Sequence, residues 1–149
     1  MFFMLFFACE DKPKDSKFTF IIKVIGCFTI DAKNNKYTVH TSRGDTSTTL
    51  ELSDIELDSI RHLFLSKKLF QVSKKFHPNC SETEDKIVHT IAKFEYNSLI
   101  YEFVIPDCES YFFNKLKIRK VNDFVLDIHN MILKKDNIKH MPKSDLIWL

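Results

Sequence analysis

The chain has 149 residues, the usual length of one domain, and its composition of 44% hydrophobic and 28% charged residues argues against an intrinsically disordered protein. Lys and Arg total 22 against 20 for Asp and Glu, interspersed without a basic tract, so nucleic acid is not an expected partner. Fifteen Phe residues supply ample apolar area for a hydrophobic core.

The N-terminal region contains a sharp change in hydropathy at Cys9. Residues 1–8 are uncharged and almost entirely apolar, whereas residues 10–17 are polar. The apolar run is too short to span a bilayer, which takes about 20 residues. It fits the end of the apolar region of a signal peptide, with the small residue Ala8 at the cleavage point.

The sequence LFFAC at residues 5–9 resembles a bacterial lipobox. The resemblance implies that the thiol of Cys9 receives a diacylglycerol, that residues 1–8 are removed, and that residues 9–17 form a tether. The acidic pair Glu10 and Asp11 resembles the start of lipoproteins from Bacteroidetes-type bacteria, in which acidic residues after the cysteine favour export to the cell surface. We therefore expect a lipid anchor on Cys9 that holds the chain at the outer membrane or cell surface.

The alternative to a lipoprotein is a soluble cytoplasmic protein whose first residues form an apolar structural strand or helix. The two interpretations share the same prediction for the rest of the chain, because residues 10–17 separate the apolar run from the folded part. We expect residues 18–149 to form a single domain.

The first half of that domain alternates polar and apolar residues. Residues 18–30 have a period of two and predict a long strand, bent or bulged at Gly26. Residues 31–36 predict a turn, residues 37–40 a second strand paired with the first, and residues 42–49 a polar loop. Ser53 and Glu56 have the spacing of a capping box, and helical spacing of apolar residues after it predicts a helix at about 54–67.

The second half repeats this layout. After a polar loop at 74–86, residues 87–96 and 99–105 predict a hairpin joined by Asn97 and Ser98. Apolar residues at helical spacing between 121 and 132 predict the second helix. The result is an α+β fold in which two β-hairpins form an antiparallel sheet with two helices packed on one face (β-β-α-β-β-α). This element order across about 18–135 also resembles small domains of unknown function in Bacteroidetes lipoproteins.

Cysteine and histidine residues suggest a disulfide more readily than a metal. Cys80 precedes the third predicted strand and Cys108 follows the fourth, so the open end of that hairpin would bring their thiols together. Reduced, buried cysteines are the alternative. His77, Cys80 and Cys108 carry zinc-ligand chemistry, but the second close pair of ligands that zinc sites use is missing. We predict no metal and no cofactor.

The sequence contains no recognisable catalytic motif. It has no nucleophile elbow, and two isolated Gly residues cannot form a glycine-rich phosphate loop. We therefore favour a non-catalytic module that binds an unknown protein partner on an open sheet face or an edge strand. Such a face would expose Ile21, Ile25 and Tyr101, while His62 and His129 would lie at helix surfaces. An unrecognised hydrolase stays open, because catalytic groups can be assembled from distant parts of a chain.

Overall fold

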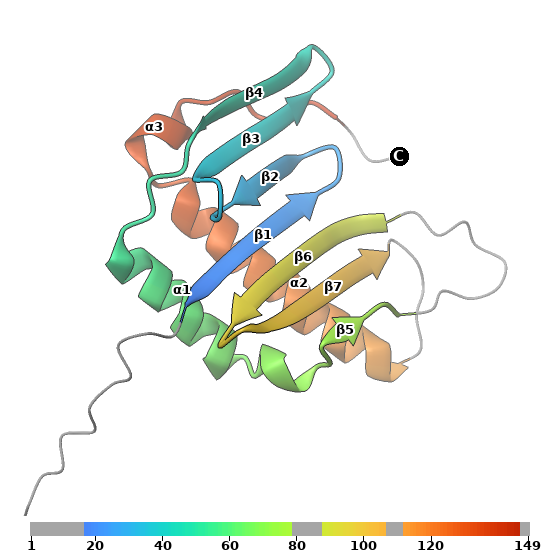
Figure 1. Ribbon diagram of the computed structural model, residues 1–149. Coiled ribbons are helices and arrows are strands. Elements are labelled where there is room, and N and C mark those ends of the chain that lie inside the picture. Colours follow the sequence, from blue (N-terminus) through green and yellow to red (C-terminus); the bar gives the residue numbers. More distant parts are fainter. Residues whose placement is uncertain (1–16, 79–87, 107–111, 147–149) are drawn as a thin grey trace, which may run out of the picture.

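The computed structural model describes residues 17–78, 88–106 and 112–146, and within them the chain has an α+β fold built on one seven-stranded sheet (Figure 1). The strand order is β4-β3-β2-β1-β6-β7-β5, and every pairing is antiparallel except that of β5 with β7. The strands are β1 (Phe18–Val24), β2 (Phe28–Asp31), β3 (Lys36–Thr41), β4 (Gly44–Thr49), β5 (Lys75–Phe76), β6 (Val88–Tyr96) and β7 (Leu99–Pro106). The helices are α1 (Asp54–Ser66), α2 (Phe112–Ile132), α3 (Asp136–Lys139) and the 3-10 helix η1 (Leu69–Gln71).

The first part of the sheet is a four-stranded meander instead of the expected two-stranded hairpin. The long strand expected at 18–30 is wrong, because Gly26 adopts a φ of 71° and reverses the chain. The amide of Cys27 donates to the carbonyl oxygen of Val24 at 3.0 Å and closes this turn. Strands β1 and β2 therefore pair with each other, with Val24 opposite Phe28.

The polar segment at 42–49, expected to be a loop, forms the edge strand β4. Gly44, with a φ of 117°, turns the chain after β3, and β4 pairs with β3 along its whole length. The segment contains three Thr residues, whose β-branched side chains favour strands even where both faces of the strand are exposed to solvent. At the opposite edge of the sheet, Lys75 and Phe76 form the short strand β5 within the segment that was expected to be a polar loop.

The second hairpin and the two longer helices are confirmed. Strands β6 and β7 are joined by Asn97 and Ser98, which have φ values of 49° and 62°, as a two-residue turn of this hand requires. Helix α1 begins at the expected capping box, in which Ser53 and Glu56 bond each other's backbone amides. Helix α2 begins well before the expected residue 121, and α3 was not expected.

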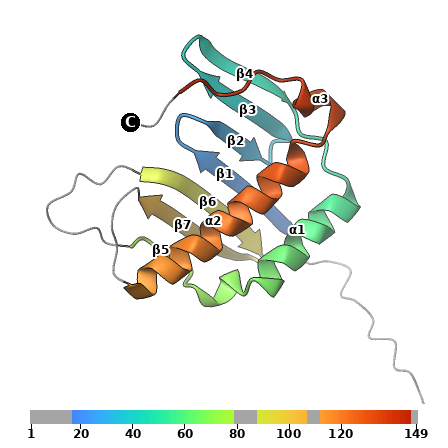
Figure 2. The ribbon, with the colours of Figure 1, turned by 180° about the vertical axis from the view of Figure 1, so that it is seen from behind.

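Both long helices lie on one face of the sheet, as expected, and α2 crosses the strands diagonally (Figure 2). The strands turn alternate side chains toward this face, including Phe20 and Ile22 of β1, which are 1% and 0% exposed. At the centre of this covered face, the ring of Phe94 in β6 lies 5.5 Å from the ring of Phe64 in α1 and 5.3 Å from the ring of Phe124 in α2. These aromatic contacts join both helices to the sheet.

Replacement of Phe64 by Ala should lower the free energy of unfolding by about 3–5 kcal/mol, because Phe64 is fully buried at this junction and its loss leaves a cavity. The matched control is Phe70→Ala in η1, where the Phe side chain is 40% exposed and the loss should be much smaller. Urea unfolding of both variants measures the difference. Equal losses would show that the helices do not pack on the sheet through Phe64.

Candidate functional site

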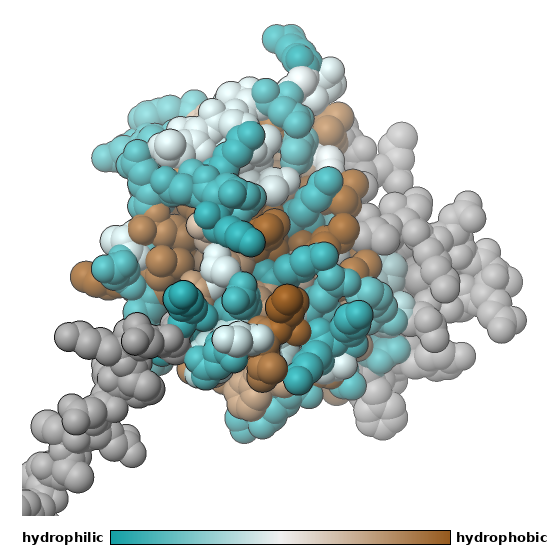
Figure 3. Space-filling view, viewed as in Figure 1, coloured by the Kyte–Doolittle hydropathy of each residue, from teal (hydrophilic) through white to brown (hydrophobic). Residues whose placement is uncertain are grey.

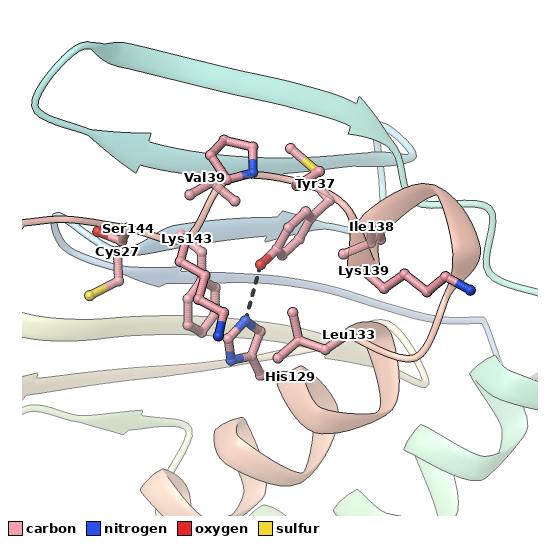
Figure 4. Close-up of a pocket in the computed structure, with 12 residues that line it drawn as sticks. Cys27, Tyr37, Val39, His129, Leu133, Ile138, Lys139, Lys143 and Ser144 are labelled. Carbon is pink, nitrogen blue, oxygen red and sulfur yellow. Dashed lines mark hydrogen bonds between the residues drawn. The ribbon is translucent and has the colours of Figure 1, made fainter.

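A pocket of about 330 Å³ lies on the covered face of the sheet, between the end of α2 and the C-terminal segment, residues 133–146 (Figure 4). Its lining comes from the β1–β2 turn, strands β2 and β3, the end of α2, α3 and the residues after α3. Most of the lining is apolar. The residues are Cys27, Phe28, Tyr37, Val39, His129, Leu133, Ile138, Lys139, Met141, Pro142, Lys143 and Ser144.

The C-terminal segment is held over β2–β4 by hydrogen bonds at several points. The side-chain amide of Asn137 donates to the carbonyl oxygen of Thr49 at 2.6 Å. Farther along, the hydroxyl of Ser144 donates to the carbonyl oxygen of Gly26 at 2.9 Å. Asp145 then accepts from the backbone amide and the hydroxyl of Ser42, at 2.7 and 2.6 Å. This segment closes one side of the pocket and does so with defined contacts.

The polar part of the pocket is a pair formed by Tyr37 and His129. The hydroxyl oxygen of Tyr37 lies 3.0 Å from Nε2 of His129, within a hydrogen bond. The imidazole also stacks on Phe28, with ring centroids 3.7 Å apart and an interplanar angle of 16°. Three rings from β2, β3 and α2 are thereby fixed against one another, so this side of the pocket is rigid.

Both polar groups of this pair are uncharged near neutral pH. Burial raises the pKa of Tyr37 to about 12, because the phenolate would lose its hydration. Burial lowers the pKa of His129 to about 4 for the same reason, since the imidazolium is the charged form of that side chain. The pair can therefore offer a ligand dipoles and aromatic surface but no net charge.

The two lysines of the pocket differ in direction. Lys143 extends from the C-terminal segment toward His129, whereas Lys139 points away from the pocket (Figure 4). An ammonium group at the mouth of a mostly apolar pocket attracts anions, and it is less screened there than on a convex surface. The pocket thus combines apolar lining, an uncharged polar pair and one cation.

The opposite face of the sheet is not covered by any helix among the described residues, and it carries a second arrangement of interest (Figure 1). The hydroxyl of Thr29 in β2 lies 2.9 Å from Nε2 of His40 in β3. Nδ1 of His40 lies 2.8 Å from a carboxylate oxygen of Asp45 in β4. Hydroxyl, imidazole and carboxylate are therefore aligned across three adjacent strands.

This open face does not form the apolar docking patch that the sequence suggested. Hydrophilic side chains gather on it, with hydrophobic ones scattered between them (Figure 3). Tyr101 is 6% exposed and belongs to the core, so the expectation that it marks an exposed face is wrong. Ile21 is half-buried between Asp31 of β2 and Lys93 of β6, which interrupt any continuous apolar surface.

The residues that the sequence singled out lie mostly beyond what the structure describes. Cys9, Cys80 and Cys108 are outside the described residues, so the lipid anchor and the disulfide stay predictions. His77 is described, and its Nε2 pairs with a carboxylate oxygen of Glu102 at 3.1 Å. Within residues 17–78, 88–106 and 112–146, no three His, Cys, Asp or Glu side chains are placed to hold a metal ion. None of the helices in these ranges is long and apolar enough to cross a membrane.

Sequence reasoning missed the residues that form both arrangements. His129 was expected at a helix surface, but it packs on Phe28, because it lies four residues after Val125 at the border of the apolar stripe of α2. That spacing was a usable signal. The pairing of His40 with Asp45 follows from the turn at residues 42–43, but it could be predicted only if 44–49 had been identified as a strand.

Comparisons with known proteins give no family or relative: no protein-family model matches the chain, and neither the curated proteins nor the solved structures contain a significant match.

The unfolding free energy should fall as pH falls from about 6.5 to about 4, because the unfolded chain binds a proton at His129 in this range while the folded chain does not. Replacement of His129 by Gln, which cannot be protonated, should remove this contribution, of up to about 1.4 kcal/mol per pH unit. Urea unfolding at several pH values gives both profiles. Parallel profiles between these pH values would contradict a buried, neutral His129.

Proposed function

We propose that the protein is a binding module whose pocket has no catalytic role of its own and takes a small, mostly apolar ligand with one anionic group. The observation that carries this proposal is the combination of apolar lining with the inward-pointing Lys143 (Figure 4). A volume of about 330 Å³ also falls within the range of small-molecule sites. The apolar part of a ligand would pack among Val39, Ile138 and Met141, while its anionic group would meet the ammonium of Lys143.

The polar groups that line the pocket are better suited to ligand binding than to hydrolysis. A hydrolytic site needs a nucleophile whose proton is taken by a neighbouring base. In the pocket the imidazole of His129 bonds the phenol of Tyr37, whose pKa of about 12 makes it a poor source of a nucleophile. The pair is suited to orient a ligand by a hydrogen bond and by stacking, and Phe28 fixes the imidazole for that purpose.

The dye 1-anilinonaphthalene-8-sulfonate, an apolar aromatic anion, should bind the native protein and gain fluorescence. Replacement of Leu133 by Trp should weaken this binding at least about tenfold, because Leu133 lines the pocket and a larger side chain occupies its volume. The matched control is Leu126→Trp, two turns earlier on α2, where Leu126 is 55% exposed and lies outside the lining. Fluorescence titration measures each affinity.

Replacement of Lys143 by Met should weaken binding of the sulfonate dye more than binding of its uncharged parent, N-phenyl-1-naphthylamine, because only the sulfonate uses the ammonium group.

Equal affinities of the dye for native protein, Leu133→Trp and Leu126→Trp would contradict the pocket as the binding site. A cooperative thermal unfolding transition verifies that each variant keeps its packed core.

We also propose that the binding module is an envelope lipoprotein, anchored through an acylated Cys9 and held away from the membrane by residues 10–17. The support is the change from apolar residues 1–8 to polar residues 10–17 at a cysteine. Several acyl chains on one residue give stable anchoring, at about 0.8 kcal/mol for each buried CH2 group. A site at the envelope would place the pocket where apolar anions such as lipid-derived carboxylates are abundant.

The mass of the chain purified from a bacterium that expresses the native gene should correspond to a protein that starts at Cys9 and carries acyl groups. Cys9→Ala should lack the acyl mass and should no longer be found in the membrane fraction. The control Cys27→Ala should carry the acyl mass and stay in the membrane fraction. Intact-mass spectrometry of the three proteins makes the comparison. A native chain that retains residues 1–8 without added mass would contradict the lipid anchor.

A further inference from the structure

The hydroxyl–imidazole–carboxylate arrangement on the open face has the geometry of an activated nucleophile. Thr29 is half-buried, and the side chains of His40 and Asp45 are 20% and 61% exposed, so solvent and small molecules reach all three. Both hydrogen bonds, at 2.9 and 2.8 Å, lie within the range over which a base takes a proton from a nucleophile. The arrangement lies on the opposite face from the pocket and is independent of the proposed ligand site.

The pairing of the strands fixes each role. His40 is directly opposite Asp45 in the β3–β4 ladder, so the carboxylate faces Nδ1 and favours the tautomer that carries its proton there. Nε2 of His40 then has a lone pair directed at the hydroxyl of Thr29. The same division of roles, with a base between a nucleophile and an orienting carboxylate, recurs in hydrolases of unrelated folds.

Two neighbours of Thr29 on the same face complete the site and provide an internal control. Lys23 of β1 lies directly opposite Thr29, and its exposed ammonium can offset negative charge that develops on an acyl oxygen. Thr38 of β3 lies opposite Thr29 on the other side, but its hydroxyl bonds that of Ser47 instead of an imidazole. The two threonines thus differ in the base beside them and also in burial, because Thr38 is only 8% exposed whereas Thr29 is half-buried.

We propose that Thr29 is an acyl-accepting nucleophile, with His40 as its general base and Asp45 as the residue that positions the imidazole, and that the substrates are small esters. The oxygen of Thr29 attacks the ester carbonyl carbon while its proton passes to Nε2 of His40. The alcohol leaves as the bond between carbonyl carbon and ester oxygen breaks, and His40 returns the proton to it. Water, deprotonated by His40, then cleaves the acyl-threonine and releases the carboxylic acid and the free hydroxyl.

The probe is p-nitrophenyl acetate, with release of p-nitrophenolate and peptide mass mapping after acid quenching as readouts. An acetyl ester on Thr29 is removed by hydroxylamine, which separates it from amides formed on lysines. Acetylation of Thr29 should exceed that of Thr38 by about 100-fold, because a positioned base contributes about 10²–10⁴-fold. The variants His40→Ala and Thr29→Val should abolish the labile acetyl group, whereas Thr38→Val should keep it.

Replacement of Asp45 by Asn tests the positioning role. It should slow acetylation of Thr29 by at least about tenfold, since the amide can hold the unwanted tautomer of His40, and Asp45→Glu should restore part of the rate. Thermal unfolding of each variant verifies that the fold is intact. Acetylation of Thr29 at or below the level of Thr38, or a rate that does not change in His40→Ala, would overturn the proposal.

Discussion

The alternation of side chains across the β1–β4 meander is the constraint on which both candidate sites depend. In β3, Tyr37 and Val39 point to the covered face, where they line the pocket, while Thr38 and His40 point to the open face. A shift of one residue in the β2–β3 register would exchange these sets and destroy the pocket and the Thr29–His40–Asp45 arrangement together. The core resists such a shift, because Ile30 pairs with Tyr37 and both are buried.

The pocket arises from the unequal cover of the two halves of the sheet. The aromatic contacts of Phe64 and Phe124 with Phe94 bring α1 and α2 onto the β1–β6–β7 half, and α2 ends at Ile132. Beyond that residue, within the part of the chain that the structure describes, the C-terminal segment with its short helix α3 is the only cover over β2–β4 (Figure 2). This segment is thinner than a helix and cannot fill the space that a helix would fill. A hollow therefore stays between the end of α2 and the C-terminal segment, and it is lined by apolar side chains of the core.

The periodicity of apolar residues in the sequence was sufficient to predict the helices and strands that bury one face and expose the other. It predicted α1 with its capping box, the β6–β7 hairpin with its Asn97–Ser98 turn, and the placement of both long helices on one face. It failed at Gly26, because alternation continues across the tight turn and hides the end of β1. It failed again at β4, where Thr and Ser occupy both faces of an edge strand and leave no apolar signal. The candidate sites lie next to these two failures, which is why their residues could not be assembled from the sequence.

A nuclear Overhauser spectrum of the aromatic region of the folded protein tests directly whether the side chains of β2 and β3 divide between the two faces of the sheet in this way. We expect contacts of the His129 ring with the rings of Phe28 and Tyr37, and contacts of the His40 ring with the methyl group of Thr29. Contacts of the His40 ring with residues of α2, or the absence of contacts between the rings of His129 and Phe28, would contradict this division of side chains.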